Sequence, residues 1–142
     1  MKRTIFLSLI IALIIGSCTH QKKSPIEGAW QLVYGNWSDE TGTFPAQIKG
    51  SDIKMWSKEY STFVGHFQID SLEQDLYGGG TYKLEGNRYE ETLLYHYFKY
   101  FIGKKVKFLL EIQNDTLILN YPTDKNWNLA EKYSTEKYIR LK

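Results

Sequence analysis

The 142-residue sequence has a single cysteine, Cys18, and only three prolines. One cysteine cannot form a disulfide within the chain, so no oxidised framework holds the fold together. The sequence also lacks long runs of Ala, Leu, Glu and Lys, internal repeats and low-complexity tracts. These absences argue against a disulfide scaffold, a helical bundle and a repeat protein, and they favour a single domain.

Basic and acidic residues balance once residues 1–17 are excluded. The chain has 18 Lys and Arg against 16 Asp and Glu, and Lys2 and Arg3 are two of the basic residues. Residues 18–142 are therefore formally neutral. A nucleic-acid-binding surface needs a basic surplus on one face, so no nucleic-acid partner is expected.

The N-terminal residues have the pattern of a secretion signal. Two basic residues precede an 11-residue, almost wholly apolar run at 5–15, which is too short to span a bilayer as a helix. The run ends in Ile15-Gly16-Ser17-Cys18, which resembles the lipobox of bacterial lipoproteins. An ordinary signal peptide that happens to precede a cysteine is the alternative.

The lipobox resemblance implies a particular processing and location. Cys18 would carry acyl chains and become the new N-terminus, and the protein would be anchored in a membrane through them. Residues 19–26 contain no acidic cluster, so we expect an outer-membrane lipoprotein of the cell envelope that faces the periplasm. The expected organisation is a signal peptide at 1–17, an acylated tether at 18–26 and one domain at 27–142.

What the sequence has in abundance is aromatic residues, with 11 Tyr, 7 Phe and 4 Trp. Aromatic side chains favour strands, and the apolar residues after the tether recur with a period of two rather than 3.6. Eight short strands joined mostly by tight turns predict an all-β fold: a closed, antiparallel, up-and-down barrel without free edges. The expected strands are 28–34, 47–57 with a bulge near 50–52, 61–69, 81–84, 88–97, 105–113, 116–121 and 136–141. The loop at 123–135 leaves room for one helical turn at 129–132.

Three consecutive glycines, Gly78 to Gly80, allow two interpretations. A phosphate-binding glycine loop lies between a strand and a helix N-terminus. The residues after Gly80 instead alternate like a strand, turn at Glu85-Gly86-Asn87 and alternate again. The glycines are therefore interpreted as a flexible or bulged entry to a hairpin strand.

Two separated elements resemble the lipocalin signature: Gly28-Ala29-Trp30 at the first strand and Arg140 in the last. The run at 78–96, followed by Gly103, is also similar to the small lipocalin-like domains of Gram-negative lipoproteins. The resemblance implies that Trp30 closes one end of the barrel and that Arg140 packs across its indole, a cation–π contact of about 0.5–2 kcal/mol. The chain is shorter than secreted lipocalins and has neither their long external helix nor a disulfide, which argues against a wide, deep cavity.

Strand parity predicts which side chains face the lumen once Trp30 is placed inside. The many large aromatics predict a mostly filled lumen with a shallow pocket at the open end. Glu91 stands out, because a carboxylate on an apolar face needs a partner or a shifted pKa. Two roles remain open for it: a structural pair with Arg140 or a tyrosine hydroxyl, which we favour, or binding the polar group of a ligand. The candidate ligand-lining residues are Phe63, Tyr82, Tyr89, Glu91, Tyr95 and Phe108.

No set of residues in the sequence points to catalysis or to a metal. His66 and His96 lie on separate strands without acidic or thiol groups at ligand spacing. Glu90 and Glu91 are adjacent and point to opposite faces, so they cannot act as a carboxylate pair. Trp37, Trp56 and Trp127 could flank a mouth, since Trp37 and Trp127 lie in predicted loops, and scattered surface tryptophans are the alternative. No cofactor is expected, and no enzymatic activity is assigned.

Two classes of function fit these expectations. The first is binding of a small hydrophobic or amphipathic ligand in or at the mouth of the barrel. The second is an interaction or assembly module that docks an unidentified partner protein through aromatic residues at its rim. A cavity above about 300 Å³ would favour the first, and a filled barrel with an exposed apolar patch would favour the second.

Overall fold

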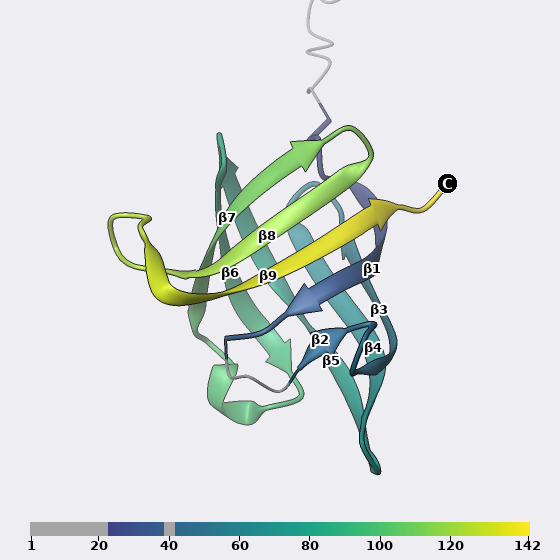
Figure 1. The fold of residues 1–142 in the computed structure, drawn as a ribbon. Coiled ribbons are helices and arrows are strands. Elements are labelled where there is room, and N and C mark those ends of the chain that lie inside the picture. Colours follow the sequence, from purple (N-terminus) through teal and green to yellow (C-terminus); the bar gives the residue numbers. More distant parts are fainter. Residues whose placement is uncertain (1–22, 39–41) are drawn as a thin grey trace, which may run out of the picture.

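The protein is an all-β molecule in which strands are joined mostly by tight turns (Figure 1). The structure, a computed structural model, describes residues 23–38 and 42–142. Among these residues the one helix is the 3-10 turn η1 (Lys99–Phe101), and nothing helical reaches the length and apolar character that a membrane crossing requires. The strands are β1 (Gly28–Asn36), β2 (Thr43–Phe44), β3 (Lys49–Trp56), β4 (Tyr60–Ile69), β5 (Leu72–Glu85), β6 (Arg88–His96), β7 (Lys105–Gln113), β8 (Thr116–Thr123) and β9 (Leu129–Arg140).

The sheet closes on itself to form a barrel. Each long strand pairs antiparallel with its neighbour along the chain, and β1 pairs with both β3 and β9, so that Trp30 lies beside Arg140. The two-residue β2 only extends the end of β1. Eight strands therefore form a closed antiparallel barrel, in which each strand has a neighbour on both sides, and this confirms the predicted all-β, up-and-down architecture.

Three local expectations are wrong. Residues 129–132 form the start of β9 rather than a helical turn, and Leu129 pairs with Thr123 at the end of β8. No bulge lies at 50–52, since β3 pairs with β4 without a shift in register. β5 begins at Leu72, well before the predicted strand, and pairs with β4 along its whole length.

The three glycines lie in the middle of β5, at a bulge in the neighbouring strand. Gly79 pairs with Tyr95 and Gly80 with Leu93, so Leu94 has no partner of its own. A Cβ on Gly80 would overlap the carbonyl oxygen of Thr92. The glycines therefore let two backbones approach closely at the bulge, and they lie between two strand segments rather than before a helix.

A second bulge interrupts β1. Leu32 pairs with Tyr138 and Tyr34 with Lys137, so Val33 is the extra residue. The bulge reverses which side chains face the lumen beyond this point. Tyr34, expected inside, lies beside the Lys137 ammonium group, and Trp37 contributes to the lumen instead.

The core fills one end of the barrel, which we call the closed end and which includes Trp30 and Tyr89, both fully buried. The chain enters at this end, and β2 and η1 lie at the opposite, open end (Figure 1). The expected signal peptide, lipobox and Cys18 lie outside the described residues. The buried hydrophobic cluster contains Ile26, Trp30, Leu32, Phe44, Ile48, Trp56, Phe67, Tyr89, Phe108, Leu110, Leu117, Leu119 and Tyr138.

Candidate functional site: the lumen pocket

The closed end is sealed by Trp30 and Arg140, as the sequence predicted. The Arg140 guanidinium carbon lies 4.1 Å from the centre of the Trp30 ring. Its two terminal nitrogens donate to the carbonyl oxygens of Glu27 (2.7 Å) and Pro25 (2.6 Å), and the indole N–H of Trp30 donates to the Ile26 carbonyl (2.8 Å). The seal therefore combines a cation–π contact with hydrogen bonds to the incoming chain.

Gly28 is required at its position in this seal. Its φ is +127°, in the region that side chains rarely adopt, and a Cβ there would lie 3.0 Å from Arg140 Nη1. The G-x-W pattern is thus explained by geometry: the glycine makes room for the arginine that covers the tryptophan two residues later.

The other half of the barrel encloses a pocket of about 550 Å³ that opens at the end of the barrel away from Trp30. We call this space the lumen pocket. The expectation of a mostly filled lumen is therefore wrong for this half, because its aromatic side chains, among them Trp37, Phe67 and Tyr121, line the wall and leave space between them. Apolar side chains form most of the wall, including Leu32, Ile48, Phe63, Phe67, Ile69, Leu76, Leu93, Val106 and Phe108.

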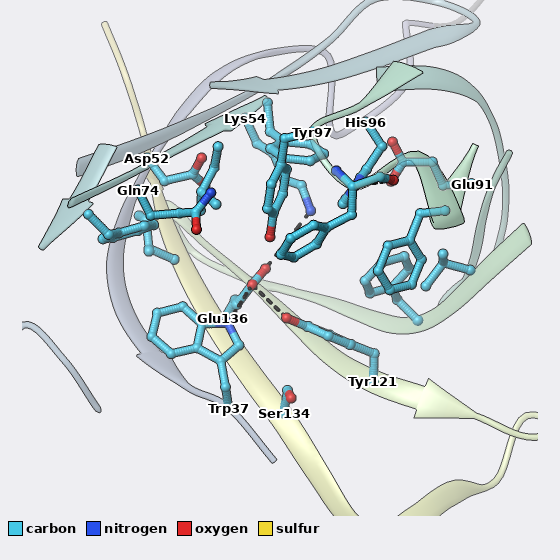
Figure 2. Close-up of a pocket in the computed structure, with 18 of the residues that line it drawn as sticks. Trp37, Asp52, Lys54, Gln74, Glu91, His96, Tyr97, Tyr121, Ser134 and Glu136 are labelled. Atoms are coloured by element: carbon cyan, nitrogen blue, oxygen red, sulfur yellow. Dashed lines mark hydrogen bonds and ion pairs between the residues drawn. The ribbon is translucent and has the colours of Figure 1, made fainter. Parts of the chain in front are cut away.

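Glu136 of β9 is the centre of a polar cluster on one side of the lumen pocket (Figure 2). One carboxylate oxygen accepts hydrogen bonds from the Tyr121 hydroxyl (2.7 Å) and the Trp37 indole N–H (3.1 Å). The other accepts from the Tyr138 hydroxyl (2.8 Å). Burial and the nearby Glu136 carboxylate raise the pKa of both tyrosines well above 10, so they are neutral donors at physiological pH.

Lys54 of β3 extends into the same cluster. Its Nζ lies 3.9 Å from Glu136 Oε2 and 5.3 to 5.9 Å from the ring centres of Phe108, Phe63 and Tyr138. A buried ammonium group of this kind is stabilised by the carboxylate and by the aromatic faces together.

Asp52, two residues earlier on β3, is the least satisfied group of the lumen pocket. The residue is 5% exposed, and its Oδ2 lies 3.2 Å from the Tyr138 hydroxyl, whose single proton it shares with the closer Glu136. Oδ1 is buried without a hydrogen-bond partner among the described residues. Burial raises the pKa of Asp52 from 3.8 to about 6, although Lys54 acts in the opposite direction. The carboxyl group is thus ionised at neutral pH at a cost in stability.

Glu91 of β6 has structural partners, one of which is a tyrosine hydroxyl as expected, that of Tyr89. One of its oxygens accepts from the Ser61 hydroxyl at 2.6 Å, and Arg140 is engaged with backbone carbonyls instead. Glu91 also lines the lumen pocket, where Figure 2 shows it opposite Asp52. Next to it, the Trp56 indole N–H donates to the Tyr89 hydroxyl (3.0 Å).

The structure divides the six candidate lining residues into three groups. Phe63, Glu91 and Phe108 line the lumen pocket. Tyr89 is buried in the closed-end core, and Tyr82 packs against its ring while its hydroxyl donates to the Ser57 carbonyl. Tyr95 is 72% exposed on the outside of the barrel. The bulge at Leu94 reverses parity here, so that His96 lines the pocket in its place.

The tryptophans expected at the rim lie in three different places in the structure. Trp37 reaches the lumen pocket, whereas Trp127 lies on the outside against the Lys107 ammonium (4.9 Å) and the Arg88 guanidinium (5.8 Å). Trp56 is buried in the closed-end core. Only Trp37 therefore contributes to the pocket.

Sequence reasoning missed Asp52, Lys54 and Glu136. A usable signal existed for all of them, because inward residues recur every second position along a strand. Arg140 was placed inside with Trp30, and Glu136 lies four residues before it in the same parity. Lys54 pairs directly with Trp30 across the β1–β3 ladder, but no strand partner was assigned to β3 from the sequence.

The arrangement gives a container with apolar walls and a charged side. Within the described part of the chain, no three His, Cys, Asp or Glu side chains are grouped in a way that could hold a metal ion. No protein-family model matches this chain, and no curated protein sequence matches it.

Proposed function

We propose that the protein is a lipid-anchored, lipocalin-like carrier that binds a small, partly apolar molecule in the lumen pocket. The observation that carries the proposal is the pocket itself: about 550 Å³ inside a closed barrel, with apolar walls and a few buried polar groups on one side. Small-molecule sites generally have this size and composition. The volume lies above about 300 Å³, the lower end of the usual range for such sites.

The seal at the other end supports the lipocalin-like assignment. The eight-stranded barrel, Gly28, Trp30 and the covering Arg140 occur together in one geometry. A barrel closed at one end and open at the other can admit a ligand only through the open end. We therefore expect the bound molecule to lie with its apolar part against aliphatic wall residues such as Leu76 and Leu93 and its polar part near the polar cluster around Glu136.

The proposed anchor is compatible with this orientation. The described chain enters at the closed end, where Arg140 binds the carbonyls of Pro25 and Glu27 (Figure 1). A lipid on Cys18 would hold that end toward the membrane and leave the mouth of the lumen pocket facing away from it. We place the protein on the periplasmic face of the outer membrane. Replacing Cys18 with Ser should release it into the soluble periplasmic fraction, and continued fractionation with membranes would contradict the anchor.

Native mass spectrometry of protein purified from its own envelope tests the binding proposal. A retained small molecule would add a defined mass to the intact chain. Leu76→Trp, which fills the lumen pocket, should abolish that mass, whereas Tyr77→Trp on the outer face of the same strand should keep it. An unchanged added mass in Leu76→Trp would place the ligand elsewhere, and its absence from the wild-type protein would argue against a carrier.

A second function is supported by the connection between β6 and β7. Tyr95, Phe98 and Tyr100 are 72%, 51% and 75% exposed, and Phe98 also lines the mouth of the lumen pocket. Exposed aromatics grouped in this way are typical of a protein-binding surface. Crosslinking in the native envelope would identify a partner there, and Tyr100→Ser should abolish the crosslinked product while leaving any bound small molecule in place.

A further inference from the structure

The charges around the lumen pocket do not balance. Three carboxylates, Asp52, Glu91 and Glu136, line it, with Lys54 as the basic residue among its lining side chains. Burial lowers the pKa of His96, so its imidazole is neutral at physiological pH. The described wall of the pocket therefore has a formal charge of −2 (three carboxylates and one lysine).

Lys54 forms an ion pair with only one of these carboxylates and acts on Asp52 from a longer distance. It pairs with Glu136, and among the described residues no Lys or Arg nitrogen lies within 4.0 Å of Asp52 or Glu91. Glu91 is partly compensated by the Ser61 hydroxyl. Asp52 has only a share in the Tyr138 hydroxyl proton, and its Oδ1 has no hydrogen-bond partner within the described part of the chain.

A buried carboxylate oxygen without a donor is costly, and native proteins rarely leave one in this state. The side chain of Asp52 lines the lumen pocket, where the positive charge of an occupant could compensate the carboxylate. A positive charge would gain most, because it would meet an excess of negative charge in a space of low dielectric constant. An anionic occupant would add a fourth negative charge and could donate nothing to Asp52.

We propose that the ligand of the lumen pocket is an amphipathic organic cation, with an ammonium head that pairs with Asp52 and an apolar part that lies against the aromatic and aliphatic wall. This inference rests on the proposed function and specifies its ligand class. The rings of Phe63 and Phe108 lie 5.3 to 5.6 Å from the ammonium group of Lys54, so this aromatic wall already accommodates one cation.

Three probes of equal chain length separate the head groups: octylammonium, octanol and octanoate. Their binding to the purified full chain is measured by titration calorimetry at pH 7.5. We expect octylammonium to bind at least about tenfold more tightly than octanol, because only its head group has a positive charge. Octanoate should bind most weakly. A tenfold difference in affinity corresponds to about 1.4 kcal/mol.

Asp52→Asn is the matched variant, because it removes the charge and retains the shape of the side chain. We expect it to lower the affinity for octylammonium about tenfold and to leave that for octanol unchanged. Its melting temperature at pH 7.5 should rise above that of the wild-type protein, since a buried charge has been removed. Higher stability together with lost preference for the cation is a combination that a purely structural role of Asp52 would not produce.

The pH dependence of octylammonium affinity in the wild-type protein provides a second test that needs no variant. The charged and titratable groups near Asp52 are Lys54 on β3 and Glu136 and Tyr138 on β9, and its partner across β4 is Gly65. Protonation of Asp52 would remove the charge that holds the ammonium head. Affinity should therefore fall as the pH is lowered from 7.5 to 5, and octanol should show no such fall.

The outcomes distinguish this inference from the proposed function. Equal binding of octylammonium and octanol would overturn the cation preference and leave the proposed carrier intact. Tightest binding of octanoate would overturn it in favour of an anion held by Lys54. Failure of all three probes to bind would count against both the cation and the lumen pocket as a binding site.

Discussion

Nζ of Lys54 lies 3.9 Å from Oε2 of Glu136, a separation that makes an ion pair inside the barrel but is too long for a hydrogen bond. The same carboxylate holds Trp37, Tyr121 and Tyr138 by shorter contacts. Lys54 thus acts mainly through its charge. It influences the neighbouring Asp52 as well as Glu136, which leads to the first prediction.

Replacing Lys54 with Met should raise the pKa of Asp52 above its present value of about 6, because the Lys54 ammonium is the main influence that lowers it. A titration of the Asp52 carboxyl carbon by NMR measures the change. Lys137→Met is the control, since Lys137 lies beside Tyr34 and away from this carboxyl group. An unchanged or lower pKa in Lys54→Met would show that the two side chains do not interact in solution.

The stability of the wild-type protein should depend on pH through Asp52. The folded-state pKa of Asp52, about 6, is above the unfolded value near 3.8. Protonation of this carboxyl group therefore stabilises the folded protein fully below pH 4, and this stabilisation is lost as the pH rises through 6. Asp52→Asn should therefore be about 1–3 kcal/mol more stable than the wild-type protein at pH 7.5, and this difference should disappear near pH 4. Urea denaturation across this range gives the two curves, and parallel curves would refute the assignment.

Ser61→Ala should destabilise the protein by about 1–3 kcal/mol, because it removes the Ser61 hydroxyl donor from the buried Glu91 carboxylate. Ser71→Ala, at an exposed turn position, should cost less than about 0.5 kcal/mol. Chemical denaturation of both variants makes the comparison. Equal small losses would mean that the Ser61–Glu91 hydrogen bond does not contribute to folding.

Arg140→Lys should cost about 2–3 kcal/mol, since a lysine cannot stack its planar group on Trp30 and donate to two carbonyls at once. Arg88→Lys is the matched control, because Arg88 contacts the partly exposed Trp127 on the outside of the barrel. Its loss should stay below about 1 kcal/mol. If both exchanges had the same effect on the melting temperature, the seal would not be a special element of the fold.

Gly80→Ala should destabilise the barrel by more than about 2 kcal/mol, because a methyl group there overlaps the Thr92 carbonyl and forces β5 and β6 apart at the bulge. The neighbouring Thr81→Ala should have a much smaller effect. Hydrogen exchange should show faster exchange in β6 for Gly80→Ala only. Wild-type protection of β6 in that variant would show that the bulge tolerates a side chain.

The barrel was predictable because a period of two along eight segments is a dense signal, repeated in every strand. The seal was predictable because Trp30 and Arg140 belong to a known pattern and their pairing needs no knowledge of the other strands. The interior was harder to predict, since parity carries over from one residue to the next only while the strand has no bulge. Bulges at Val33 and Leu94 exchanged Tyr34 for Trp37 and Tyr95 for His96 in the lumen.

The polar cluster escaped prediction for a different reason. Asp52, Lys54 and Glu136 are residue types that are ordinarily exposed, and each becomes understandable inside only beside the others. Their charges compensate one another only because β1 pairs with both β3 and β9 and so brings these two strands close together. The pairing of β1 with β9 links strands that are far apart in the sequence. The extended hairpin of β4 and β5 was missed because residues 72–77 are too polar to resemble a strand.

The hydrogen bonds from Arg140 to the carbonyl oxygens of Pro25 and Glu27 have a mechanical consequence. The last strand holds the segment through which the described chain enters, so tension applied from the N-terminal side is borne first by this clamp. Any remaining force acts along the axis of β1. This direction shears the backbone hydrogen bonds between β1 and its neighbours β3 and β9, so many of these bonds must break at the same time. A barrel pulled from its sealed end would thus withstand force better than one peeled open strand by strand.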